Sequence, residues 1–176
     1  MFEVRPAQID NAKQEFARTK GSPFNYTVMD GLLTPQTAEQ CFQEFQSLDL
    51  SKSVSYADPD FEFDKFAINK KEQFPEKLAQ VFEYVHSPEV IALIEKITGL
   101  QGLQVDGGRW GGGLHIIKPG GYLAVHRDFT VLPTTYQNPK QFLRVINLIG
   151  YFNEGYESSW GGELELWNNE IGRAHV

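Results

Sequence analysis

Residues 111–128, with the sequence GGGLHIIKPGGYLAVHRD, are the stretch that decides the fold of this chain. Two apolar runs flank the Pro-Gly-Gly at 119–121, a combination typical of a tight turn. The second run leads directly into His126 and Asp128. Because residues two apart on a strand point to the same face, we expect the imidazole and the carboxylate to converge. The stretch therefore predicts a β-ribbon that carries two metal-binding side chains.

A histidine and an aspartate separated by one residue supply two of the three ligands in the two-histidine, one-carboxylate site of non-haem Fe(II) oxygenases. By itself the pattern is common, and an exposed polar pair is the alternative reading. The residues downstream favour a metal site. A loop at 130–141 is followed by a long apolar run at 142–153 and then by the sequence WGGELEL at 160–166.

The chain beyond Gly99 is rich in glycine and in short runs of β-forming residues. The runs expected to be strands are residues 103–105, 114–117, 122–125, 142–152 and 163–167. Short strands separated by turn residues are typical of an antiparallel sandwich or barrel. We therefore expect an α+β fold in which N-terminal helices pack on a double-stranded β-helix (jelly-roll, cupin-like) core that is incomplete in this chain.

The first hundred residues have mainly helical patterning. Residues 1–23 are polar and weakly patterned, and residues 24–29 alternate as a short strand would. Helices are expected from Thr34 and Pro35 to about Leu48, over residues 76–85, and from Ser87 to a C-cap at Gly99. The apolar stripe of the first helix consists of Ala38, Cys41, Phe42, Phe45 and Leu48.

Three features of the first hundred residues allow more than one interpretation. Residues 51–70 lack a clean period and predict a solvated loop, with or without a short strand, and are a candidate lid. His86 lies between two expected helices, where a capping or surface role is favoured over a ligand role. Cys41 is the only cysteine, which excludes an internal disulfide, and its amphipathic setting predicts a buried, unreactive thiol.

Length and charge place the chain among single-domain globular proteins. Its 176 residues suit one domain, with a helical support region at 1–100 and the N-terminal part of the jelly roll at 101–176. The net charge of −7 argues against nucleic acid or an anionic membrane as a partner. The N-terminus does not resemble a signal peptide, and no apolar run reaches membrane-spanning length. We therefore expect a cytoplasmic protein.

From about residue 111 to 167 the chain resembles the Fe(II)- and 2-oxoglutarate-dependent oxygenases of the prolyl 4-hydroxylase type. The family pattern is a glycine-rich turn, H-x-D, an arginine leading into Tyr-Leu-Asn, and then Gly-Gly-x-Leu. This chain has the same order, with YFN at 151–153 as the one conservative departure. The resemblance implies an oxidoreductase that uses Fe(II), 2-oxoglutarate and O₂, with ascorbate as a candidate accessory reductant, to hydroxylate a C–H bond.

The resemblance also implies roles for individual residues. His126 and Asp128 correspond to catalytic iron ligands, and retention of the carboxylate favours hydroxylation over halogenation. The residues placed at the 2-oxoglutarate pocket are Tyr151, Ile149, Leu164 and Ile117. Ile117 stands where the family often has a tyrosine. His115 is a candidate second-shell or substrate-contacting residue, with a core or interface position as the alternative. Arg144 falls at a family arginine, where we expect a structural ion pair rather than cosubstrate binding.

Two parts of the family pattern are missing. A third ligand, a histidine on a late strand, and a basic residue about ten positions later are expected beyond Asp128. His175 is the only later histidine, and no cation follows it. We therefore expect the chain to be a fragment of an oxygenase that lacks the distal histidine and the 2-oxoglutarate-binding cation and that is inactive alone.

Two other interpretations remain open. One is a non-catalytic cupin-like binding or interaction module, and the other is a different metal-dependent cupin enzyme. The substrate class implied by the resemblance is a protein side chain, such as a peptidyl proline, or a small molecule. Neither nucleic acid nor a membrane is an expected partner, and a homodimer that completes the open sheet is a further candidate.

Overall fold

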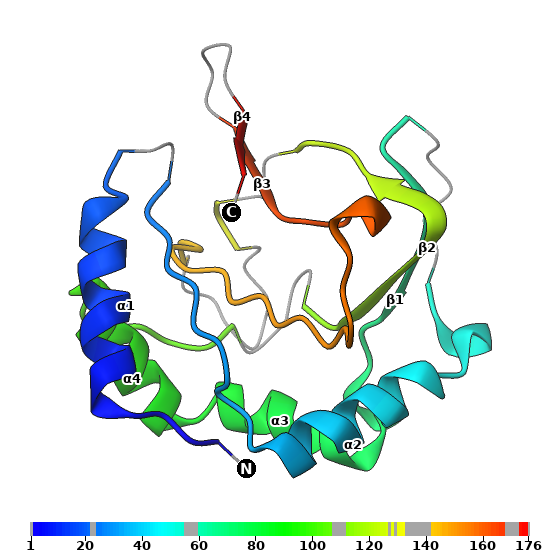
Figure 1. The fold of residues 1–176 in the computed structure, drawn as a ribbon, viewed down its shortest axis with the longest axis horizontal. Coiled ribbons are helices and arrows are strands. Elements are labelled where there is room, and N and C mark those ends of the chain that lie inside the picture. Colours follow the sequence, from blue (N-terminus) through cyan, green and yellow to red (C-terminus); the bar gives the residue numbers. More distant parts are fainter. Residues whose placement is uncertain are drawn as a thin grey trace.

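The computed structural model describes residues 2–21, 24–54, 60–106, 112–126, 128, 130–132, 142–167 and 173–175. Within these residues the fold is α+β, with four α-helices and two separate two-stranded antiparallel sheets. In Figure 1 the helices form a layer along the left and the bottom, and the ribbon of β1 and β2 stands on the right. The α+β class expected from the sequence is confirmed.

Helix α1 (Pro6–Arg18) was not expected from the sequence. It begins with a proline in its first turn, and Ala12 is its one buried residue, which explains why residues 1–23 show little apolar pattern. It packs against α4 (Pro88–Thr98). In the described part of the chain no helix has the length and apolar character needed to cross a membrane.

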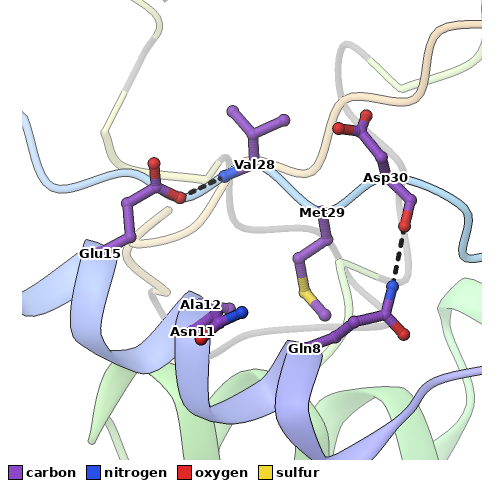
Figure 2. Close-up of a pocket in the computed structure, with 7 residues that line it drawn as sticks. All are labelled: Gln8, Asn11, Ala12, Glu15, Val28, Met29 and Asp30. Atoms are coloured by element: carbon purple, nitrogen blue, oxygen red, sulfur yellow. Dashed lines mark hydrogen bonds between the residues drawn. The ribbon is translucent and has the colours of Figure 1, made fainter.

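The strand predicted at residues 24–29 is wrong. Side chains of α1, rather than a neighbouring strand, bind the backbone of this segment. The Glu15 carboxylate accepts from Val28 N–H at 2.9 Å, and Gln8 donates to the Asp30 carbonyl at 2.9 Å (Figure 2). A cavity of about 370 Å³ remains between α1 and this segment, and none of its lining residues belongs to the predicted site.

The other three helices lie close to where the sequence placed them. Helix α2 (Pro35–Gln46) starts at Thr34, whose hydroxyl accepts from Thr37 N–H. Helix α3 (Glu76–Val85) has the expected bounds, and α4 runs from the Ser87 cap to Gly99, which has φ 76°. In the predicted stripe of α2, Cys41 is fully buried but Ala38 is exposed. His86 has the expected capping role, since it is the C-cap residue of α3 and its Nδ1 donates to the Phe82 carbonyl.

Residues 62–68 form a strand, β1 (Glu62–Ile68), which pairs with β2 (Leu114–Leu123). The prediction of a lid at residues 51–70 is therefore wrong for residues 62–68. The alternative that this region contains a short strand is confirmed. The turn predicted at 119–121 does not separate two strands, because β2 continues through it, but Gly120 has the positive φ, 82°, that is typical of a tight turn. Phe63 pairs with Tyr122 and Lys65 with Ile117, so the single residue 64 opposes the four residues 118–121 in a large bulge.

Two other predicted strands are absent from the described part of the chain. In the 103–105 segment, Leu103 N–H donates to the Glu95 carboxylate of α4. The 142–152 segment is not part of a strand. Among the described residues its backbone hydrogen bonds run from Leu132 N–H to the Phe142 carbonyl and from Arg144 N–H to the Thr130 carbonyl, which makes an isolated bridge between Val131 and Leu143. An extended segment without a ladder partner is not a strand. The last predicted strand is partly confirmed, as β3 (Glu165–Trp167) pairs with β4 (Arg173–His175).

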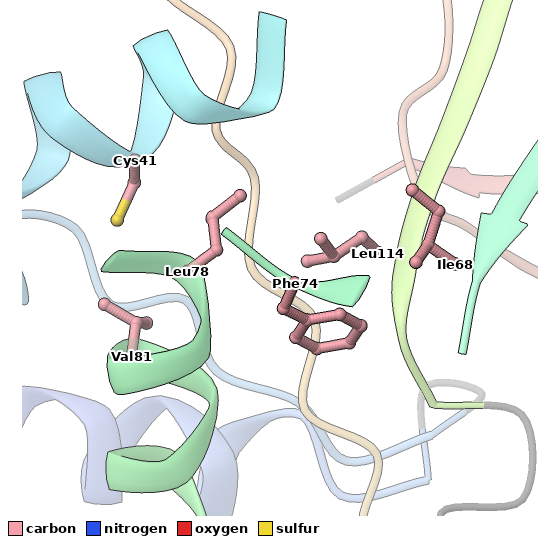
Figure 3. Packing of buried hydrophobic residues seen from close by; sticks show 6 residues of the cluster. All are labelled: Cys41, Ile68, Phe74, Leu78, Val81 and Leu114. Atoms are coloured by element: carbon pink, nitrogen blue, oxygen red, sulfur yellow. The ribbon is translucent and has the colours of Figure 1, made fainter. Parts of the chain in front are cut away.

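The buried core joins the helices to one end of the ribbon. Its members, drawn in Figure 3, are Cys41, Ile68, Phe74, Leu78, Val81 and Leu114. Phe152 extends this core by stacking on Phe45 with ring centroids 5.7 Å apart. Burial, with a smaller contribution from the Glu44 carboxylate, raises the pKa of the Cys41 thiol to about 11. The unreactive thiol expected from the sequence follows from this environment.

We predict that native Cys41 resists thiol reagents. With a pKa of about 11, roughly one thiol in a thousand is ionised at pH 8, and only the thiolate is nucleophilic. Labelling with Ellman's reagent at pH 8 should be slow in buffer and rapid in guanidinium chloride. Fast labelling of the native chain would contradict the burial of Cys41.

We also predict that Glu44 stabilises the start of α3. Its two carboxylate oxygens accept from the backbone N–H groups of Lys77 and Leu78, at 2.9 and 2.8 Å. Glu44→Ala should lower the free energy of unfolding by about 1–2 kcal/mol, measured by urea denaturation. Glu39→Ala is the control, because Glu39 is on the same helix and, among the described residues, accepts a hydrogen bond from Gln43 of its own helix; it should change stability by less than about 0.5 kcal/mol.

Candidate functional site

His126 and Asp128 lie beyond the end of β2, not on a strand. The alternation argument that predicted their convergence is therefore wrong at this place. They nevertheless meet, because His126 Nε2 lies 3.3 Å from Asp128 Oδ1. The local path of the chain after Leu123, rather than strand geometry, brings the two side chains together.

The ring of His126 is oriented by backbone groups and by one aromatic side chain. Its Nδ1 lies 2.8 Å from the Ala124 carbonyl, which can only accept a hydrogen bond, so Nδ1 carries a proton. Ala124 in turn donates its N–H to the Phe61 carbonyl at 2.7 Å. The Phe61 ring meets the imidazole edge-on, with centroids 5.2 Å apart. As a result Nε2 is the atom that faces Asp128.

The second oxygen of Asp128 is held from the opposite side. Arg144 Nη1 lies 3.2 Å from Oδ2, and Asn147 Nδ2 lies 3.5 Å from the same atom. The Arg144 side chain is 18% exposed, and its backbone N–H donates to the Thr130 carbonyl. Arg144 therefore forms the ion pair expected from the sequence, with Asp128 as its partner. Asn147 was not predicted as part of the site.

The space between His126 Nε2 and Asp128 Oδ1 suits a positive centre. Because Nδ1 is bonded to the Ala124 carbonyl, Nε2 is the ring nitrogen that faces the carboxylate, and a cation bound there would interact favourably with Asp128. Two ligand atoms about 2.1 Å from a metal and at right angles lie about 3.0 Å apart, close to the observed 3.3 Å. The donor pair therefore fits a cation bound by both residues.

The described residues supply only two ligands at this place. Searched over that part of the chain, no group of three or more histidine, cysteine, aspartate or glutamate side chains could hold a metal ion. The backbone of His175 lies in β4 opposite Glu165. The side chain of His175 lies outside the described part of the structure, as do Gly111 and residues 127, 129 and 133–141.

Tyr151 and Leu164, both predicted at the cosubstrate pocket, are brought together. The backbone N–H of Leu164 donates to the Tyr151 hydroxyl. Burial raises the pKa of Tyr151 above its usual value, the Leu164 bond opposes this shift, and the Glu163 carboxylate adds to it. The side chain is still 61% exposed. The phenol therefore stays protonated at neutral pH.

Ile117 and Ile149 lie on different elements. Ile117 is in the middle of β2, opposite Lys65, and Ile149 is in the extended 142–153 segment that crosses the middle of Figure 1. Both side chains are exposed. A common pocket for these two residues with Tyr151 and Leu164 stays a prediction.

His115 lies on β2 opposite Ala67 and near a charged pair on β1. Desolvation by the surrounding protein lowers the pKa of His115, the Lys65 ammonium lowers it further, and the Glu62 carboxylate opposes both. The neutral imidazole is therefore the main form at physiological pH. Sequence reasoning missed Glu62 and Lys65 because the run of acidic and aromatic residues at 58–64 resembles a solvated loop.

Comparisons with known proteins give no match. No family model matches the chain, and no curated protein or solved structure matches it. The candidate site therefore rests on the geometry of His126, Asp128 and their neighbours.

We predict that His115 titrates below the usual histidine value of 6.5. The folded state then binds its proton less readily than the unfolded state, so this residue reduces stability as pH falls below about 6.5. Lys65→Met removes the repulsion and should raise the pKa of His115 in an NMR titration. An unchanged His115 titration in folded Lys65→Met would contradict the assigned electrostatics.

Proposed function

We propose that this chain carries part of the catalytic centre of an Fe(II)- and 2-oxoglutarate-dependent dioxygenase of the prolyl 4-hydroxylase type. One observation carries the proposal: His126 Nε2 and Asp128 Oδ1 face each other at 3.3 Å, with Nδ1 already bonded to a carbonyl. Metal-binding histidines usually donate their other ring N–H in this way. The proposal includes a jelly-roll core of which residues 101–176 form the N-terminal part.

The residues around the pair have distinct tasks in this proposal. His126 and Asp128 hold the iron, and the Ala124 carbonyl keeps the imidazole in the required tautomer. Arg144 and Asn147 occupy Asp128 Oδ2, so the carboxylate offers one oxygen to the metal. Bound iron supplies the chemistry in which 2-oxoglutarate and O₂ become succinate and CO₂ while one oxygen atom enters a substrate C–H bond.

The cosubstrate needs two kinds of contact from the protein. Tyr151 and Leu164 are proposed to line its pocket with an aromatic and an aliphatic wall, together with Ile149 and Ile117. The far carboxylate of 2-oxoglutarate needs a cation. Arg144 is engaged by Asp128 Oδ2, so we assign it to the support of the iron ligand and not to the cosubstrate.

The alternative is a non-catalytic binding module with the same fold. One observation favours it: Asp128 already has Arg144, Asn147 and His126 as neighbours, and this polar cluster is satisfied without a metal if His126 carries two protons. The two proposed functions differ in what occupies the space between His126 Nε2 and Asp128 Oδ1. A metal titration therefore separates them.

We predict weak binding of Fe(II) to this chain that depends on His126 and Asp128. Anaerobic Fe(II) and 2-oxoglutarate should produce the visible metal-to-ligand charge-transfer band only at high metal concentration, because two protein ligands are present. His126→Ala or Asp128→Ala should reduce the affinity for Fe(II) by at least about tenfold. Loss of a residue that merely hydrogen-bonds to a metal ligand already lowers metal affinity by about that factor.

The matched control is His86→Ala, because His86 has the same Nδ1–carbonyl contact and lies at the end of α3. It should leave the titration unchanged. A band of equal strength in His126→Ala, or no metal-dependent signal from the folded chain at any concentration, would support the non-catalytic module instead. Tight stoichiometric binding would show that this chain provides a third ligand.

A further inference from the structure

A buried ion pair lies in the β1–β2 ribbon. Glu62 Oε2 is 2.7 Å from Lys65 Nζ, and the two side chains are 3% and 11% exposed. The other oxygen of Glu62, Oε1, is buried and has no hydrogen-bond partner among the described residues. A buried carboxylate oxygen without a donor is costly, so this pair is poorly arranged for stability alone.

The pair spans the bulge in the ribbon. Glu62 and Lys65 flank the point where the register shifts, and residue 64 between them opposes four residues of β2. Asp64 has φ 45°, a left-handed conformation that is unfavourable for a residue with a side chain. Gly121 approaches the Phe63 carbonyl so closely that a Cβ atom there would lie 2.8 Å from it. The ion pair therefore ties together the two sides of a strained irregularity.

The bulge determines where the end of the ribbon lies. Beyond it, Glu62 pairs with Leu123, and the Phe61 carbonyl accepts from Ala124 N–H at 2.7 Å. Ala124 supplies the carbonyl that binds His126 Nδ1, and Phe61 supplies the ring that contacts the imidazole. Both groups that orient His126 are thus adjacent to the Glu62–Leu123 pair.

We propose that the Glu62–Lys65 pair is a positioning device for His126. It holds the bulge so that the ribbon presents the Ala124 carbonyl and the Phe61 ring to the imidazole, and so keeps the ring oriented with Nε2 facing Asp128. Its relevance to metal binding rests on the proposed function, but the ring orientation does not. Bulges are known to re-aim side chains beside active sites.

The free energy of unfolding distinguishes a positioning role of the Glu62–Lys65 pair from a purely stabilising role. Replacement of a buried ion pair by apolar residues of similar size is often neutral or stabilising. The double variant Glu62→Leu/Lys65→Met should therefore unfold at the same or a higher urea concentration than the parent. If the pair positions His126, the orientation of the imidazole ring should change although the stability of the fold does not.

The test is NMR of the aromatic ring protons, recorded for every variant at the same pH. In the parent chain the His126 ring protons should show nuclear Overhauser effects to the Phe61 ring, whose centroid lies 5.2 Å from that of the imidazole. In the double variant these effects should be lost, whereas Lys65→Arg, which keeps the ion pair, should retain them. His86 is the internal control, because its own ring contact with Phe82, at a centroid distance of 4.7 Å, should persist in every variant.

Lys52→Met is the matched control variant, since Lys52 pairs with Asp49 at the same spacing but on the surface. It should leave His126 unchanged. An unaltered contact between the His126 and Phe61 rings in the folded double variant would overturn the inference, as would a loss of stability with parallel changes at His86. If the ring contact responds as expected but neither the parent nor any variant binds Fe(II), the proposed function fails and the positioning role stands.

Discussion

The antiparallel pairing of β1 with β2 is the interaction on which the rest of the structure depends. At one end of the ribbon Ile68 and Leu114 are buried in the core that the helices share. At the other end the last ladder contact, from Ala124 N–H to the Phe61 carbonyl, leads directly to His126. One pairing therefore links the stable part of the molecule to its candidate site.

The candidate site is a short chain of polar contacts. The Ala124 carbonyl binds one nitrogen of His126, the other nitrogen faces Asp128, and Asp128 binds Arg144 through its second oxygen. The space between Nε2 and Oδ1 is the place that suits a cation. The chemistry that we propose depends on whether that cation is a metal ion.

Stability and site geometry make different demands on this fold. The Glu44 carboxylate binds two N–H groups at the start of α3 and so satisfies both of its oxygens. The Glu62 carboxylate is buried, one of its oxygens has no hydrogen-bond partner among the described residues, and it lies near Asp64 with its strained backbone. A contact of the first kind is expected in any stable protein, whereas the second kind is found where shape matters more than stability.

The sequence by itself determined the elements that depend on local signals. Helices α2 and α4 were predicted because Thr34 marks the start of α2 and Ser87 and Gly99 mark the two ends of α4, and α3 was predicted because its apolar residues recur at helical spacing. The H-x-D pair was also identified, since its two residues lie only two positions apart in the chain. The partner of Arg144, the contacts of Asn147 and the pairing of β1 through a bulge were decided only by the tertiary structure. These contacts join distant segments, and an extended segment becomes a strand only where a second backbone meets it.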